Sequence, residues 1–442
     1  MAPLDGDEPF AMSSVRPVAS TGAAPGAPPV SARTSVDFMM TYLSEALMLV
    51  AGLVTFHLVA RRFGTQGFSD YQVARGIIAL VAPVAGLGLA TSFLKHLPTV
   101  SDAPRVLTRM VVLHTTALGV VCGVMSMSAA VLGTGFGLFS LQLAIATAVV
   151  GAAITMFTLV LSGLRGVAMP VTSSVMGSVG LGLGPLVAIA VSASLVAMFW
   201  VQAGVLVLLA TLALLRWQRQ PTSASSVSTA SRPGLRAAQR IVVRYGLSRV
   251  LGDIALPLVF VLPTLYVAYA DEGSAAGYIG FATSVVMLGC SALATLTPIL
   301  LPRFSRVLST GGAISRQWTT IGPFGVALAA LVCTAVGELS SGWVVGWYLG
   351  DAFAPAATVT RVCLLAAVPL ALFYYSRVVL DAMLPYAWSA RTAFVGFCVG
   401  SVTGAVLSVW ASPLVVAESA FLASAVSMGL AALASLVRLR GM

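Results

Sequence analysis

Apolar runs about as long as a membrane is thick recur along nearly the whole chain. A helix needs about 20 apolar residues to cross the hydrocarbon of a bilayer. The strands of a membrane barrel would instead alternate apolar and polar residues over about 10 positions, and these runs do not alternate. The pattern predicts about twelve spanning helices, near residues 38–60, 71–94, 107–132, 138–161, 170–191, 194–215, 246–269, 277–300, 318–338, 354–376, 392–410 and 414–436.

A polar gap divides these runs into two sets of six. We expect a cytoplasmic tail without fixed structure at residues 1–36 and an N-terminal bundle at 37–216. A basic cytoplasmic linker at 217–240 would lead to a C-terminal bundle at 241–442. Two halves of equal span number indicate an internal duplication of the kind found in transporters. Tyr71 and Tyr278 support it, because each opens the second span of its half.

The composition agrees with an all-α membrane protein. The 442 residues are 58% hydrophobic and only 9% charged, and the mean hydropathy is +0.98. Soluble domains carry about 25% charged residues. A chain so poor in charge cannot cover a surface that faces water, so we expect two pseudo-symmetric six-helix bundles embedded in lipid.

The loop charges predict the orientation. Arg and Lys gather in cytoplasmic loops of membrane proteins, and here they fall in alternate loops, whereas Arg61 and Arg62 stand alone on the other side. We therefore expect a multi-pass protein of the bacterial inner membrane with both termini in the cytoplasm. The residues assigned to the cytoplasmic side include Lys95, Arg105, Arg109, Arg165, Arg216, Arg232, Arg236, Arg240, Arg303, Arg306, Arg316, Arg391, Arg438 and Arg440.

The motifs of common enzymes are missing from the sequence. It contains no GxxxxGK[ST], HExxH or GxSxG pattern, and its five cysteines are dispersed in apolar runs. The net charge of +10 comes from short loops rather than from one basic face, which argues against nucleic-acid binding. We expect no enzymatic activity, no cofactor and no metal site, and the passage of cargo through the membrane is the activity that remains.

Two acidic residues lie within predicted spans. Glu45 is in the first span and Asp253 is in the seventh, at nearly equivalent places in the two halves. Buried charge is costly in lipid, so each residue calls for a reason. One reason is coupling to a proton or a sodium ion, or pairing with a cation in a central cavity. The other is a purely structural pair, since Arg249 and Asp253 are four residues apart on one helix face.

Three arginines lie deepest within the spans: Arg75, Arg249 and Arg361. The planar guanidinium suits the recognition of phosphate, so these are the candidate substrate-binding cations. The alternative for Arg75 is a side chain that reaches up to the lipid headgroups.

Small residues and prolines modify the predicted helices. Gly396, Gly400 and Gly404 recur on one helix face and predict close packing against a neighbouring helix. Pro257 and Pro263 follow Asp253 and make the seventh helix a candidate for bending.

Several short segments resemble one known family. They are residues 52–56 (Gly-Leu-Val-Thr-Phe), 60–64 (Ala-Arg-Arg-Phe-Gly), Gly67, Tyr71, 83–88 (Pro-Val-Ala-Gly-Leu-Gly), 277–282 (Gly-Tyr-Ile-Gly-Phe-Ala) and 348–353 (Tyr-Leu-Gly-Asp-Ala-Phe). These segments resemble the O-antigen and polysaccharide repeat-unit flippases, within the multidrug/oligosaccharidyl-lipid/polysaccharide exporter superfamily.

The resemblance implies a V of two helix bundles around a cavity. It further implies that the carrier moves an undecaprenyl-pyrophosphate-linked oligosaccharide from the cytoplasmic to the periplasmic leaflet by alternating access. Membrane lipids and a proton or sodium ion would be its other partners. Two alternatives stay open: a drug/cation antiporter on the same scaffold, and a non-transporting membrane scaffold for polysaccharide assembly.

Overall fold

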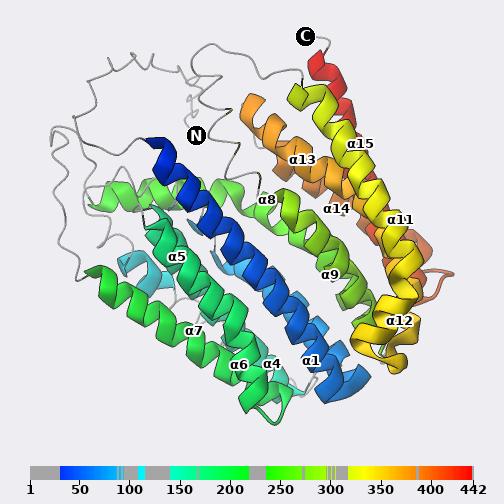
Figure 1. Ribbon diagram of the computed structural model, residues 1–442, viewed down its shortest axis with the longest axis horizontal. Coiled ribbons are helices and arrows are strands. Elements are labelled where there is room, and N and C mark those ends of the chain that lie inside the picture. Colours follow the sequence, from blue (N-terminus) through cyan, green and yellow to red (C-terminus); the bar gives the residue numbers. More distant parts are fainter. Residues whose placement is uncertain are drawn as a thin grey trace, which may run out of the picture.

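A computed structural model of the chain describes most of the predicted spans (Figure 1). Beyond its main segments, it describes residues 89–90, 93, 108–114, 296, 300 and 304. Most of the predicted span at 107–132, residues 1–29 of the predicted tail and residues 219–234 of the predicted linker lie outside these ranges. The main described segments are residues 30–86, 140–166, 169–218, 235–270, 274–294, 317–384 and 388–440.

The first helix, α1 (Val30–Gly86), covers the first two predicted spans and bends between them. It begins at Val30, before the predicted end of the tail. Its apolar part, Tyr42–Leu80, has 39 residues and would measure about 58 Å if straight, about twice the thickness of the hydrocarbon. The bend lies at Gly64, whose φ of 69° is open to glycine at little steric cost. A single continuous element is therefore long enough for two membrane crossings.

The helices that follow in the first half match the predicted runs. The run at 170–191 contains a π-helical turn, and Pro185 explains it because proline cannot donate to the carbonyl four residues earlier. The elements are α4 (Leu141–Gly166), α5 (Pro170–Gly177), the π-helix η2 (Ser178–Leu183), α6 (Gly184–Val191) and α7 (Leu195–Gln218).

The second half repeats this arrangement of long apolar helices. Its helix α8 (Leu235–Ala270) runs without interruption through Pro257 and Pro263. The later elements are α9 (Ala275–Ala294), η4 (Gln317–Ile321), α11 (Gly322–Leu349), η5 (Asp351–Phe353), α12 (Ala354–Leu364), α13 (Ala367–Met383), α14 (Trp388–Leu407) and α15 (Pro413–Arg440).

The predicted span at 354–376 is broken. Helices α12 and α13 meet at an angle of 49°. Pro369, near the start of α13, cannot donate to the carbonyl of Leu365, and its ring clashes with that carbonyl. The missing hydrogen bond at Pro369 therefore explains why the helix is interrupted between α12 and α13.

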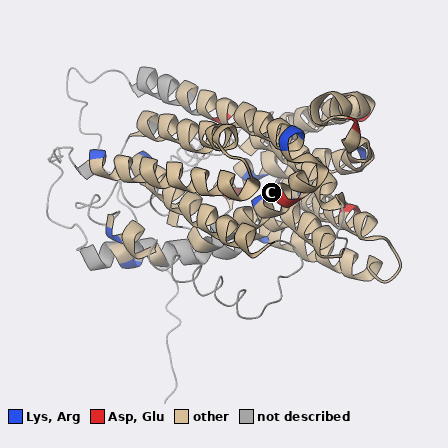
Figure 2. Ribbon diagram, turned by 90° about the horizontal axis from the view of Figure 1, so that it is seen from below, with Lys and Arg blue, Asp and Glu red and all other residues tan. Residues whose placement is uncertain are grey.

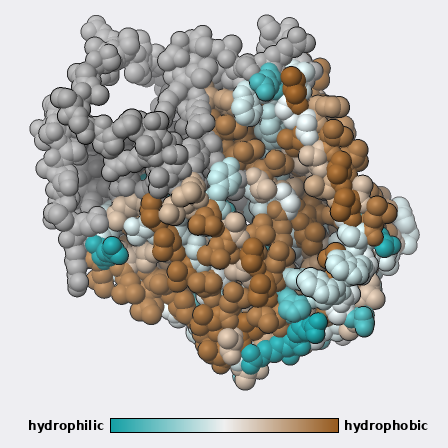
Figure 3. All heavy atoms as spheres, in the orientation of Figure 1, coloured by the Kyte–Doolittle hydropathy of each residue, from teal (hydrophilic) through white to brown (hydrophobic). Residues whose placement is uncertain are grey.

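The surface of the described residues fits lipid. Within the described residues, eight helices are long and apolar enough to cross a membrane, with α1 counted once, or nine if α12 and α13 form one span. Leu339 on α11 is 88% exposed, and the exposed rings of Trp343 and Trp347 stack 6.0 Å apart. Hydrophobic residues dominate the face in Figure 3, and charged segments are sparse along the helices in Figure 2. The chain is a multi-pass membrane protein, and the predicted all-α fold is confirmed.

The helices converge at one end of the molecule. In Figure 1, the start of α1 and the upper end of α11 stand well apart, whereas the lower end of α1 lies near α12 and the lower end of α11. The start of α1 and the end of α15 lie at the same end. Two large clusters of buried side chains form the core, one mostly within residues 56–217 and one mostly within 255–436.

The glycine stripe of α14 is packed against α15, as predicted. A Cβ atom added at Gly400 would lie 1.9 Å from Ser424 Oγ and 2.6 Å from the carbonyl oxygen of Ala420. At Gly404, the same atom would lie 3.4 Å from Ala420 Cβ, which is ordinary contact. The two helices therefore approach most closely at Gly400.

This difference predicts unequal effects of the same substitution. Gly400→Ala should destabilise the protein by about 1–3 kcal/mol, because the methyl group must displace a backbone carbonyl in a packed interface. Gly404→Ala is the matched control and should leave the thermal midpoint in detergent nearly unchanged. Equal midpoints for the two variants would contradict the packing described here.

Candidate functional site

The candidate site lies where α1 meets the second half. We call it the closed junction: residues 56–76 of α1 together with the parts of α8 and α9 that they contact and with residues 348–353. Glycine permits the approach, because a Cβ atom at Gly277 of α9 would lie 3.1 Å from Ser69 Cα. One at Gly76 of α1 would lie 2.9 Å from Val261 of α8. The backbones of the two halves are therefore in near contact.

Arg75 projects into the closed junction. Its guanidinium donates to Ser284 Oγ on α9 over 2.6 Å and to Gln72 Oε1 over 3.3 Å, and it stands 4.7 Å from the centre of the Phe56 ring. Among the described residues, no carboxylate forms an ion pair with it. Neutral groups and an aromatic face thus hold a half-buried cation.

Gln72 adds a donor beside Arg75. The side chain is only 3% exposed, and its Nε2 has no hydrogen-bond partner within the described part of the chain. A buried donor without an acceptor is costly, by about 1–3 kcal/mol. Together the amide and the guanidinium offer hydrogen-bond donors to an acceptor-rich group.

An aromatic layer seals the closed junction. Phe68 of α1 is fully buried, and its ring lies 5.3 Å from Phe353 and 6.4 Å from Phe281, both in the second half. Such pairs contribute about 0.5–1.5 kcal/mol each beyond their burial. Tyr71 stacks on Phe199 at 6.2 Å, and Tyr278 meets Phe353 at 6.4 Å. The two tyrosines at matching places in the predicted duplication therefore both lie in this layer.

Tyr348 ties α11 to α1 at the edge of the layer. Its hydroxyl donates to the carbonyl of Leu53, and its own carbonyl is hydrogen-bonded to His57 Nδ1. These contacts join residues almost 300 positions apart. No spacing in the sequence could indicate them.

The structure places Arg361 and Glu45 outside the closed junction. Arg361 is exposed, and its Nε donates to Ser341 Oγ on α11 over 2.7 Å. Glu45 lies nearer the start of α1, where Arg165 at the end of α4 attracts its carboxylate. Arg249 and Asp253 are on α8, but their side chains lie outside the described residues.

A second polar cluster lies between α13 and α14. Asp381 accepts from the backbone nitrogen of Ser389 over 2.9 Å and from Ser389 Oγ over 2.6 Å, and Arg377 Nε is 3.9 Å from the same carboxylate. Sequence reasoning missed this cluster. The i, i+4 spacing of Arg377 and Asp381 was its available signal.

Comparison with solved structures identifies the fold. No family model and no curated protein matches the sequence, whereas solved structures match over most of the chain. An outward-facing multidrug resistance MATE transporter of the MOP superfamily has a TM-score of 0.62 at 13% identity, over 91% of this chain and 95% of that one. The lipid II flippase MurJ, in an inward closed conformation, scores 0.64 at 12% identity, over 91% and 87%.

A third match differs in its reported pocket. It is a MOP superfamily transporter from Pyrococcus furiosus, described as having a binding pocket of reverse polarity that suggests a different function. It has a TM-score of 0.59 at 13% identity and covers 92% of this chain and 94% of that one. All three are transporters. The chain therefore shares the fold of these transporters, as the sequence resemblance implied.

The closed junction can be tested by disulfide formation. A Cβ atom at Gly277 would lie 3.3 Å from Ser69 Cβ, close to the separation of about 3.5–4.5 Å found in disulfides. In a cysteine-free background, Ser69→Cys with Gly277→Cys should cross-link rapidly under mild oxidant. Proteolysis within residues 219–234 would then reveal two halves held together until they are reduced.

The control replaces the second position with Gly289→Cys, twelve residues further along α9 and about 18 Å away along its axis. This pair should not cross-link. Equal cross-linking of both pairs would show that the junction is not formed as described.

Proposed function

We propose that this protein flips an undecaprenyl-pyrophosphate-linked oligosaccharide from the cytoplasmic to the periplasmic leaflet by alternating access. The observation that carries the proposal is Arg75, a half-buried cation without a carboxylate partner among the described residues. The unpartnered Gln72 Nε2 beside it supports the same ligand chemistry. A phosphate oxygen suits both donors, because charge-assisted hydrogen bonds are about twice as strong as neutral ones.

The position of Arg75 suggests how cargo and conformation are coupled. Its present partners are a hydroxyl and an amide oxygen, so in each of these hydrogen bonds only the arginine is charged, whereas a bond to phosphate has charge on both sides. A pyrophosphate that reaches the guanidinium competes favourably with Ser284. It thereby withdraws a contact that holds α1 to α9 and favours the opening of the closed junction.

The orientation completes this proposal. With both termini cytoplasmic, the lower ends of α1 and α11 in Figure 1 face the periplasm, and their separated upper ends face the cytoplasm. The inner membrane is the site of action, with membrane lipids and a proton or sodium ion as further partners. Glu45 and Asp253 remain the candidates for ion coupling or charge pairing, and Arg249 and Arg361 remain candidate cavity cations.

A drug/cation antiporter is the second candidate. The similarity to MATE transporters supports it as a fold-level argument. Two charges oppose it: Arg75 would repel a cationic drug, and Arg165 offsets the negative charge of Glu45. A non-transporting scaffold would not depend on Arg75 at all.

Arg75→Ala should lower surface polysaccharide by about tenfold in a deletion strain of the host, since it removes a charged hydrogen bond of about 1.5 kcal/mol or more. Arg75→Lys should restore only part of the activity, because a point charge lacks the bidentate fork. Arg249→Ala and Arg361→Ala test the remaining cations, and exposed Arg61→Ala is the matched control.

Drug sensitivity of the same strains separates the two transport functions. The flippase predicts unchanged sensitivity and a polysaccharide defect. Normal polysaccharide with Arg75→Ala would contradict the assigned role, and a deletion that changes only drug sensitivity would favour the antiporter.

A further inference from the structure

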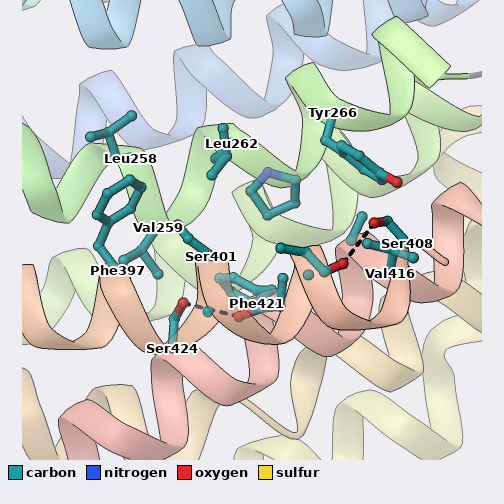
Figure 4. A pocket seen from close by; sticks show the side chains of 16 residues that line it. Leu258, Val259, Leu262, Tyr266, Phe397, Ser401, Ser408, Val416, Phe421 and Ser424 are labelled. Atoms are coloured by element: carbon teal, nitrogen blue, oxygen red, sulfur yellow. Dashed lines mark hydrogen bonds between the residues drawn. The ribbon is translucent and has the colours of Figure 1, made fainter.

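A pocket of about 260 Å³ lies within the second half and is distinct from the closed junction (Figure 4). Helices α8, α14 and α15 each contribute part of its wall. Leu258, Leu262 and Pro263 come from α8, Phe397 from α14, and Phe421 from α15. Apolar cavities of such size stay dry and accept apolar guests.

The pocket opens toward lipid rather than toward water. Leu262 and Ala405, which line it, are both exposed on the surface of the helices. Their neighbours on α14, Val402 and Val406, are apolar and 64% and 51% exposed. A membrane-dissolved molecule can therefore reach the pocket laterally.

The serines of the wall present little polarity to a guest. Ser408 Oγ donates to the carbonyl of Ala405, and Ser424 Oγ donates to that of Ala420. Ser401 is the exception, since its hydroxyl is buried without a partner among the described residues. The wall thus suits a hydrocarbon chain, and Ser401 offers a way to distinguish such a chain from an oxygen-bearing guest.

Helix α8 connects this pocket to the closed junction. Its residue Val261 faces Gly76, the neighbour of Arg75, while Leu258 and Leu262 line the pocket. A helix with its side chains is about 10–12 Å across. If the phosphate of a lipid lies near Arg75, its long flexible tail needs to pass around only α8 to reach the pocket.

We propose that the pocket between α8, α14 and α15 holds part of the polyprenyl tail of the lipid-linked substrate during transport. This inference rests on the proposed function and extends it from the headgroup to the tail. The tail then remains in an apolar environment at the membrane face while the headgroup crosses between the halves. Filling the pocket should impair tail binding without touching Arg75.

The test uses the full chain in vesicles of phosphatidylethanolamine and phosphatidylglycerol. One arm contains undecaprenyl phosphate with a benzophenone on its chain, and the other contains phosphatidylglycerol with the same group on an acyl chain. After illumination, labelled peptides are identified by mass spectrometry. The polyprenyl probe should label α14 and α15 around Phe397 and Phe421, and excess undecaprenyl phosphate should compete.

Variants at the mouth of the pocket make the result specific. Ala405→Phe should lower the labelling by about tenfold, and Gly404→Leu should act in the same direction. Val402→Phe, on the same helix but outside the pocket, is the matched control. Ser401→Ala should leave labelling unchanged, because a hydrocarbon does not need its hydroxyl. Thermal midpoints identify any variant that fails to fold, and the other pocket-filling variant then carries the comparison.

Three outcomes would overturn the inference: equal labelling by the phospholipid probe, labelling that Ala405→Phe and Gly404→Leu do not change, or loss of labelling with Ser401→Ala. A parallel assay of lipid-linked oligosaccharide flipping in the same vesicles separates the two proposals. Labelling as expected without flipping would contradict the proposed flippase function and leave the tail site supported. Flipping without pocket labelling would remove the tail site alone.

Discussion

The backbone of this chain must satisfy its own hydrogen bonds, because hydrocarbon offers no water to replace them. Long uninterrupted helices follow from that constraint. Three irregular points among the described residues have a local cause: the positive φ of Gly64, the π-turn before Pro185, and the break before Pro369. These points shape the fold, since they decide where a helix can change direction inside or at the edge of the membrane.

Close approach of helices is the second determinant of the architecture. Lipid does not drive helices together as water would, so contact depends on small residues and specific polar bonds. Gly277 and Gly76 let the halves meet at the closed junction, and Gly400 lets α14 lie against α15. The first contact joins the two halves, whereas the second belongs to one half alone. If the halves rock against each other, only the contact at the closed junction has to separate.

The polar chemistry of the closed junction fits an interface that opens. Arg75 is held by Ser284 and Gln72 rather than by an acid, so separation does not leave an orphaned carboxylate in lipid. An ion pair there would cost several kcal/mol per charge to part without water. Helix α8 packs against α1 on one side and lines the apolar pocket on another. A movement of α8 at the closed junction would therefore also change the shape of the pocket.

The sequence alone determined the helical membrane fold, and it located most spans because bilayer thickness sets the length of every apolar run. The run predicted at 170–191 is α5, η2 and α6, and Arg75 was identified as a candidate substrate-binding cation. The sequence could not reveal that Ser284, 209 residues away, would bind Arg75, or that Glu45 would lie near Arg165. Such contacts depend on which helices are neighbours and on which side of each helix faces protein. Hydrophobicity does not predict that side when lipid and protein interior are equally apolar. The packing of side chains in the tertiary structure decides which helices are neighbours.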